Sequence, residues 1–169
     1  ARDLSSCGKR RCAIADTLLL RAVHRLNRCL KPDVVVLLGD MIDDPAGPSV
    51  CDELERLKTI VDKIECPTIA IPGNHDGDIE RYYRVFPRPE PVVDIAGVRF
   101  VTFIDPEEPG YNARRSEDDL RRMTLARAGH DGPMVAVQHV PFFPPGASPS
   151  PYKLLNADTA WKAFERNGY

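Results

Sequence analysis

The spacing of apolar residues divides the first half of the chain into helices and strands. Residues 16–30 carry apolar side chains three or four positions apart, which predicts an amphipathic helix. Residues 34–38 are all apolar and mostly β-branched, as is typical of a strand buried on both faces in a parallel sheet. A second helix is expected after Ser49, with Asp52 completing an approximate capping box, and residues 68–71 form the next strand. This order predicts two parallel strands joined by a right-handed crossover.

The second half of the chain follows a different pattern. Residues 92–95 and 98–104 flank an Ala-Gly pair, which predicts an antiparallel hairpin. A helix with an acidic first turn is expected over residues 116–129, because negative charge stabilises the N-terminal end of the helix dipole. Residues 134–138 form another apolar strand, and a last helix ends near Gly168. Helices and strands therefore alternate as in an α/β fold, with the hairpin and the later strand in a second sheet.

Size, charge and cysteine usage narrow the possible functions. The 169 residues suit one domain, and the net charge of −2 provides no general positive field for nucleic acid or an anionic membrane. No apolar run approaches the length of a membrane span. The spacing of the five cysteines matches no zinc framework. We expect Cys29, Cys51 and Cys66 to be buried free thiols, and Cys7 and Cys12 to be surface thiols rather than a disulfide or a ligand pair. This usage favours a reducing compartment, the cytoplasm.

Three of the predicted strands lead into polar residues that can bind metal ions. In chain order these residues are Asp40, Asn74, His75, Asp76 and His139. In open α/β sheets, sites form beyond the carboxyl ends of the strands, so we expect these side chains to lie together despite their separation in sequence.

Glycine precedes the polar residues at two of these turns. A turn that directs a ligand inward often needs positive φ or a close approach of two backbones, and Gly39 and Gly73 permit both. Gly39-Asp40, the Gly-Asn-His-Asp run at 73–76 and His139 resemble, in that order, the second, third and fourth motifs of the calcineurin-like metallophosphoesterases. The resemblance covers residues 15–169.

The resemblance implies a role for each of these residues. Asp40 would bridge two divalent metal ions (Mn, Fe or Zn), because a carboxylate has two oxygens. Asn74 and His139 would bind the second ion. His75 would lie beside the scissile phosphate, stabilise its charge or protonate the leaving oxygen, and Asp76 would hold His75 in the correct tautomer. Two such ions can clamp the attacking and leaving oxygens of an in-line displacement.

The resemblance also implies a fold and an activity. The fold would be a four-layer α/β/β/α sandwich with mixed sheets, in a single domain of residues 1–169. The activity would be hydrolysis of a phosphodiester or phosphomonoester by metal-activated hydroxide, on a small phosphorylated or nucleotide substrate. The family's first motif, Asp-x-His, and its last, Gly-His-x-His, do not occur here. Because both would lie at the ends, we expect the sequence to be incomplete at both ends. The alternative is a non-catalytic protein of this fold that acts as an interaction module.

Each candidate residue also has a simpler interpretation. Asp40 could be a plain turn residue, and Asn74 could occupy a left-handed position in a tight turn. His75 and Asp76 could form a surface ion pair, and His139 could be a buried, hydrogen-bonded histidine. The site interpretation is favoured because titratable residues at the carboxyl ends of strands are where sites form.

Aromatic and basic pairs lie near the candidate residues. The aromatic pairs 82–83 and 142–143 each follow a candidate motif, and each could line a substrate pocket or pack in the core. The arginine pairs 114–115 and 121–122 are expected to be solvated faces of a loop and a helix.

Overall fold

The computed structural model describes residues 14–144 and 146–169, which fall into two compact units. The first unit ends at Arg88 and the second is Pro89–Tyr169. The single domain of residues 1–169 stays a prediction. Cys7 and Cys12 lie outside the described residues. The described part of the chain is of the α/β class, with five α-helices and several sheets, and none of its helices is both long and apolar enough to cross a membrane.

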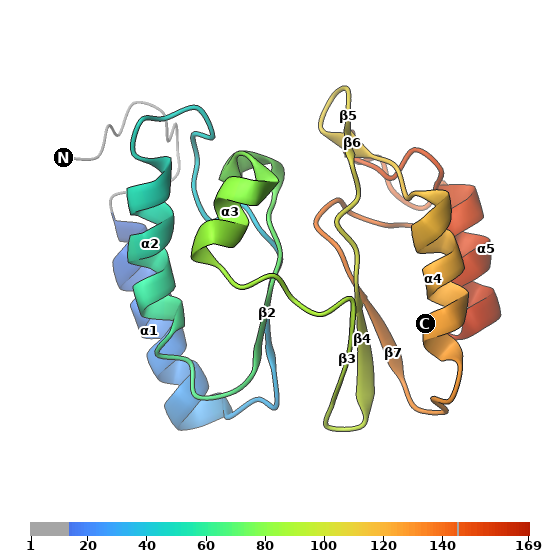
Figure 1. Ribbon diagram of the computed structural model, residues 1–169, viewed down its shortest axis with the longest axis horizontal. Coiled ribbons are helices and arrows are strands. Elements are labelled where there is room, and N and C mark those ends of the chain that lie inside the picture. Colours follow the sequence, from blue (N-terminus) through green and yellow to red (C-terminus); the bar gives the residue numbers. More distant parts are fainter. Residues whose placement is uncertain (1–13, 145) are drawn as a thin grey trace. The chain divides into compact units, whose positions relative to one another are not determined.

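The first unit contains the predicted parallel strand pair. Its elements are α1 (Ala15–Arg25), the π-helical turn η2 (Leu26–Leu30), β1 (Val35–Leu37), α2 (Val50–Val61), β2 (Thr68–Ala70), the 3-10 turn η3 (Asn74–Asp76) and α3 (Ile79–Val85). β1 and β2 pair in parallel, with Val36 opposite Ile69. Helices α1 and α2 lie side by side (Figure 1). The strand–helix–strand unit is therefore confirmed, although β1 is only half-buried rather than buried on both faces.

Helix α2 supplies much of the core of this unit. Leu54, Leu57 and Val61 of its inner face are all buried. Helix α3, which the apolar spacing did not predict, adds Tyr82, and the residue just after the helix, Phe86, stacks on it with the ring centres 4.8 Å apart. Burying side chains of this size contributes about 1.5–3 kcal/mol each.

The predicted first helix differs from the structure at its C-terminal end. The chain continues from α1 into the π-helical turn, where the Lys31 amide donates to the carbonyl oxygen of Leu26 at 2.7 Å. A π-helical turn contains more residues than an α-helical turn, so it rotates the following side chains. Leu30, which continues the apolar spacing of residues 16–30, is consequently exposed.

Two further expectations for the first unit are wrong. The Ser49 side chain makes no cap to the α2 backbone, and its Oγ instead donates to Glu53 Oε1 at 2.9 Å. Cys29 and Cys51 are exposed rather than buried, because they lie on helix faces that do not pack inward, whereas Cys66 is half-buried.

The second unit contains a three-stranded mixed sheet. Its elements are β3 (Val92–Ile95), β4 (Val98–Thr102), β5 (Glu107–Glu108), β6 (Asn112–Ala113), α4 (Glu117–Arg127), β7 (Met134–Val137) and α5 (Ala157–Asn167). The sheet order is β3-β4-β7, with β3 antiparallel and β7 parallel to β4. This confirms the predicted hairpin and places the later strand in the same sheet.

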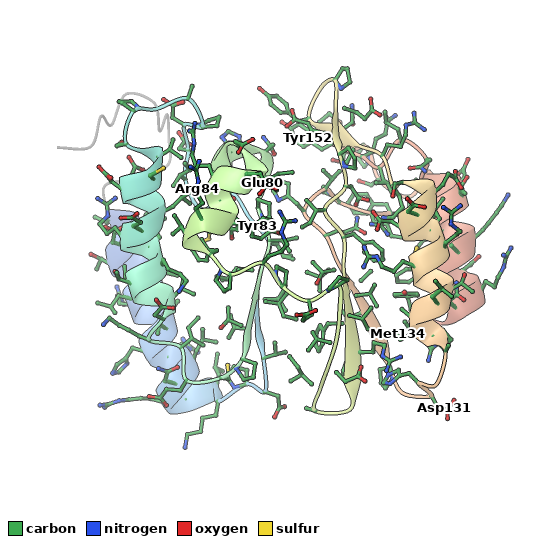
Figure 2. The ribbon with its side chains drawn as sticks, viewed as in Figure 1. Glu80, Tyr83, Arg84, Asp131, Met134 and Tyr152 are labelled. Carbon is green, nitrogen blue, oxygen red and sulfur yellow. The ribbon has the colours of Figure 1, made fainter. Side chains whose placement is uncertain are left out.

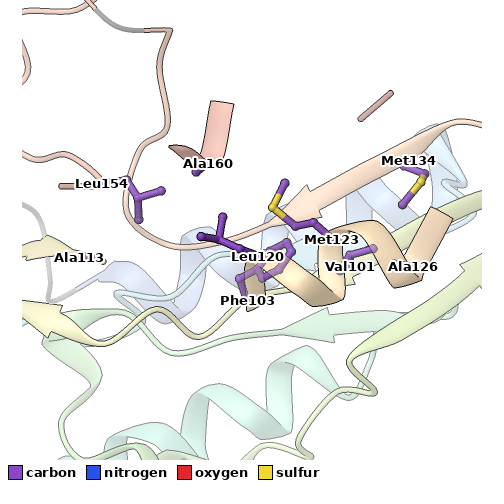
Figure 3. Close-up of a cluster of buried hydrophobic side chains, with 9 residues drawn as sticks. All are labelled: Val101, Phe103, Ala113, Leu120, Met123, Ala126, Met134, Leu154 and Ala160. Carbon is purple, nitrogen blue, oxygen red and sulfur yellow. The ribbon is translucent and has the colours of Figure 1, made fainter. Parts of the chain in front are cut away.

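Helices α4 and α5 lie side by side in this unit (Figure 1). As expected, acidic residues occupy the first turn of α4, where Ser116 caps the helix by accepting from the Asp119 amide at 3.1 Å. The core between sheet and helices includes Val101 and Phe103 from the end of β4, Met123 from α4 and Leu154 from the segment before α5 (Figure 3). These side chains are almost completely buried. This core supports the carboxyl ends of β4 and β7.

Candidate functional site

The turns that follow β1 and β2 touch through their backbones. Gly39 has φ +89°, and a Cβ there would lie 2.2 Å from the nitrogen of Gly73 and 2.6 Å from its Cα. No side chain fits in that space, so Gly39 is needed both for its positive φ and for the close approach. Gly73 itself has an extended backbone with φ −106°. Close approach and positive φ therefore both explain Gly39, whereas the backbone of Gly73 is one that any residue can adopt.

Asp40 lies within hydrogen-bond distance of the Asn-His-Asp turn. Its backbone is left-handed, with φ +55°, a conformation that Asp tolerates better than most residues. Its Oδ1 accepts a hydrogen bond from the His75 amide at 3.1 Å. Asp40 is thus a turn residue, and its carboxylate also meets the second turn. Asp40, Asn74, His75 and Asp76 are brought together in the first unit.

Asp76 is completely buried and joins the two turns. Its Oδ1 accepts from the amides of Met41 and Ile42 at 2.7 and 3.3 Å, and its Oδ2 accepts from the Gly73 amide at 2.8 Å. Burial raises the pKa of Asp76 above its usual value, although these three hydrogen bonds act to lower it. We expected this carboxylate to hold the His75 ring, but in the structure its partners are backbone amides.

The His75 ring has a different partner. Its Nδ1 lies 2.7 Å from the carbonyl oxygen of Asp43. Because a carbonyl oxygen can only accept, this contact assigns a proton to Nδ1 and leaves Nε2 as the nitrogen for other chemistry. The carbonyl of Asp43, rather than the carboxylate of Asp76, therefore selects the tautomer. The sequence offered no signal for this contact, because any residue could supply the carbonyl.

His139 belongs to the second unit and follows β7 by two residues. It is half-buried. The residue before it, Gln138, donates from Nε2 to the carbonyl oxygen of Val140 at 2.7 Å. The convergence of His139 with Asp40 and Asn74 stays a prediction.

The predicted metal ligands do not form an acidic or histidine cluster within the described residues. In the part of the chain that the structure describes, no group of three His, Cys, Asp or Glu side chains could hold an ion. The predicted set does not need such a group, because one of its members is the Asn74 amide oxygen.

The aromatic pairs serve mainly to pack the two cores. Tyr82 is fully buried, and Tyr83 of α3 (Figure 2) has the guanidinium carbon of Arg88 4.1 Å from its ring centre. Phe142 packs against the ring of Trp161, with the centres 5.4 Å apart. Phe143 instead borders a surface hollow of about 260 Å³.

Arg115 contradicts the expectation that its pair is solvated. It is 2% exposed and forms a bidentate ion pair with Asp105, whereas Arg114 is exposed beside Glu108. The sequence does contain a signal, because Ala113 is buried and alternation along an extended chain places Arg115 on the same side. Arg121 is exposed as expected, and Arg122 is half-buried with its guanidinium over the Phe103 ring.

Comparison with known proteins agrees with the motif order. Residues 14–168 match the family model described as calcineurin-like phosphoesterase. The chain is also 34% identical over 115 residues to a protein of Synechococcus sp. named probable cyclic nucleotide phosphodiesterase. That match covers 65% of this chain but 43% of the relative, so the chain spans less than half of the relative's length. The family model covers almost every residue, and we conclude that the chain belongs to the calcineurin-like phosphoesterase family.

Proposed function

We propose that this protein hydrolyses a phosphate ester in a metal-dependent reaction, with a small nucleotide as the preferred class of substrate. Family membership supports the reaction class, and the name of the Synechococcus relative supports the nucleotide. The observation that carries the proposal is the contact between the two turns, where the Asp40 carboxylate accepts the His75 amide at 3.1 Å. That contact brings the Asp40 carboxylate against the backbone of the turn that carries Asn74 and His75.

Asp40, Asn74 and His139 are the residues that would hold metal. Asp40 would bridge two divalent ions of Mn, Fe or Zn, and Asn74 and His139 would bind one of them. When bound, such ions supply Lewis acidity and lower the pKa of water to about 7. The rigid backbone contact of Gly39 with Gly73 holds the Asp40 turn against the Asn74 turn before any ion binds. A site that is already ordered loses less conformational entropy on binding.

His75 is the proposed acid that meets the phosphate. Its Nδ1 proton is engaged by the Asp43 carbonyl oxygen, so Nε2 is the nitrogen that would face the phosphate. In the imidazolium form, which carries a proton on each nitrogen, Nε2 would stabilise phosphate charge or give its proton to the leaving oxygen. Asp76 keeps this arrangement in place by tying the amides of Met41 and Gly73 together. The four-layer α/β/β/α sandwich, the cytoplasmic location and the activity of the whole protein belong to the same proposal.

The test combines metal binding with hydrolysis. Mn²⁺ is titrated into the protein by calorimetry, and hydrolysis of an aryl phosphodiester and of a cyclic nucleotide is followed with and without Mn²⁺. We expect Asn74→Ala to lose both Mn²⁺ binding and hydrolysis. His75→Ala should retain Mn²⁺ but lose hydrolysis by about 10²–10⁴-fold, the usual contribution of a positioned acid.

Two variants in the same unit serve as controls. Asn27→Ala removes an amide side chain that bonds the backbone at Lys63, and His24→Ala removes an exposed histidine of α1. Both should keep the wild-type rates. Metal-dependent hydrolysis that survives in Asn74→Ala would refute the proposed site. A wild-type protein with neither Mn²⁺ binding nor hydrolysis would instead support the interaction module.

A further inference from the structure

A buried arginine lies beside the segment that carries His139. Arg115 Nε and Nη2 donate to the two oxygens of Asp105 at 2.7 and 2.8 Å. The two side chains are only 2% and 4% exposed. A bidentate pair of this kind is strong and directional, and in a dry site it is hard to rearrange. This pair therefore holds the guanidinium in one orientation.

Further contacts fix the rest of Arg115. Its guanidinium carbon lies 3.6 Å from the centre of the Phe103 ring, and its Nη1 lies 3.7 Å from Met123 Sδ. Its backbone is held by the Asn156 side chain, which accepts from the Arg115 amide at 3.0 Å and donates to its carbonyl oxygen at 2.9 Å. Arg115 is thus a rigid donor built into the core of the second unit.

This rigid donor also reaches Gln138. Arg115 Nη2 donates to Gln138 Oε1 at 2.7 Å. A guanidinium only donates, so the Gln138 atom that faces it must be the oxygen, and the amide nitrogen is turned the other way. That nitrogen donates to the carbonyl oxygen of Val140 at 2.7 Å. Gln138 and Val140 flank His139, so the bond closes a short ring across the backbone of His139.

We propose that Arg115, acting through Gln138, is a positioning residue for His139. It holds the backbone of the turn after β7 so that the imidazole is already placed when a metal ion binds. This inference rests on the proposed function, in which His139 is a metal ligand. Partners that orient a ligand in this way commonly change metal affinity or activity by about 10–100-fold when they are removed.

Gln138→Met is the first test, because it removes both hydrogen bonds in a side chain of similar length and leaves the Arg115–Asp105 pair whole. In the metal-free protein, NMR relaxation should show the backbone order parameter of His139 falling from about 0.85 towards 0.6. By calorimetry, Mn²⁺ affinity should fall by about tenfold or more. This order parameter is measured without metal and without substrate, so it is independent of activity. If Gln138 only stabilised the fold as a whole, its replacement would not lower the order parameter at His139 in particular.

Arg115→Lys tests the arginine itself. Lysine keeps a positive charge for Asp105 but lacks the planar fork that reaches both partners. We expect the same loss of Mn²⁺ affinity as in Gln138→Met, and no further loss in the double variant, because the two residues act as one unit. Arg99→Lys is the matched control. Arg99 forms a similar bidentate pair with Asp94 at the start of β4, and this change should leave His139 and Mn²⁺ binding unaltered.

Two results would overturn the inference, and only one of them would also overturn the proposed function. If wild type binds Mn²⁺ but Gln138→Met leaves both the affinity and the order parameter of His139 unchanged, Arg115 and Gln138 do not position the ligand, and the proposed function stands. If wild type binds no Mn²⁺, the proposed function fails and the positioning role fails with it.

Discussion

Each unit of this protein has a nearly buried carboxylate beyond the end of a strand, and the two are stabilised in different ways. Asp76 of the first unit accepts hydrogen bonds from three backbone amides. Asp105 of the second unit accepts from the guanidinium of Arg115. In Asp76 the partners are neutral, so burial still raises its pKa. In Asp105 the partner carries a full opposite charge.

This difference determines how substitutions at each buried carboxylate affect the stability of the protein. Backbone amides are present at almost every position, so the hydrogen bonds of Asp76 depend on one side chain, that of Asp76 itself. The ion pair of the second unit depends on two side chains, Arg115 and Asp105. Removing one of them leaves the other buried and unpaired. Removing both leaves no charge to compensate. Substitutions can therefore separate the two arrangements.

The largest expected effect is from Arg115→Met. This change leaves the Asp105 carboxylate buried without its partner, and we expect a loss of about 3–5 kcal/mol in the free energy of unfolding. Urea unfolding followed by circular dichroism measures it. Arg121→Met is the control, because the pair of Arg121 with Asp118 is exposed and should contribute almost nothing. Equal losses in the two variants would contradict the role of the buried pair.

Asp76→Asn should have the next largest effect. The amide oxygen can replace one carboxylate oxygen, but the NH₂ group then opposes a backbone donor, so we expect a loss of about 1–3 kcal/mol. Asp78→Asn changes an exposed carboxylate that caps α3 by accepting from the Arg81 amide, and asparagine caps equally well. Urea unfolding of both variants provides the measurement. An unchanged stability in Asp76→Asn would show that the three amides do not need a carboxylate.

A smaller effect is expected when both members of the buried pair are replaced. The double variant Arg115→Met with Asp105→Leu places apolar side chains where the charges were, and such replacements are often neutral. We expect it to recover most of the stability lost in Arg115→Met alone, again by urea unfolding. A double variant as unstable as the single one would mean that the contacts of Arg115 with Phe103 and Gln138 matter more than the charge.

The smallest effect should appear at alkaline pH, where the two units again differ. Burial raises the pKa of Tyr83 and of Tyr169 from 10.0 to about 12. A raised pKa in the folded state means that the stabilisation is complete below pH 10 and is lost as the pH rises towards 12. We therefore expect the free energy of unfolding to fall less steeply between pH 10 and pH 12 in Tyr83→Phe and in Tyr169→Phe than in the wild type.

Below pH 10, the two tyrosine variants should differ in their free energy of unfolding. Tyr169 donates to the Met123 carbonyl oxygen at 3.0 Å, so its hydroxyl contributes about 1 kcal/mol there. Within the described residues, the buried Tyr83 hydroxyl has no hydrogen-bond partner, so Tyr83→Phe should be neutral or stabilising. The reverse order of stabilities at neutral pH would contradict these assignments.

Local patterns were enough to predict most of the elements. The apolar runs gave the parallel pair of β1 and β2, the hairpin of β3 and β4, and the helices α2, α4 and α5. Gly39 was identified from its place before Asp40, and the structure explains it by the approach of Gly73. Helix α3 was overlooked, although Asp78 is a good N-cap and Tyr82 and Phe86 are one turn apart.

Contacts between distant residues were not predictable in the same way. The Asp43 carbonyl that orients His75 could have come from any residue type, and Arg115 finds Gln138 23 positions away. We expect Cys51 to be buried because it lies beside the predicted apolar face of its helix, yet it is exposed on the outer face of α2. Residue type and spacing predict which face of an element is apolar, but the partner of a polar group depends on how the elements pack.

Crystals of the protein soaked with Zn²⁺ would locate the bound ion directly through its anomalous scattering. We expect one peak that is bound by the Asp40 carboxylate, the Asn74 amide oxygen and a ring nitrogen of His139, each about 2.0–2.2 Å away. A peak that contacts Asp40 and Asn74 while His139 lies elsewhere, or no peak at these residues, would contradict a shared metal site.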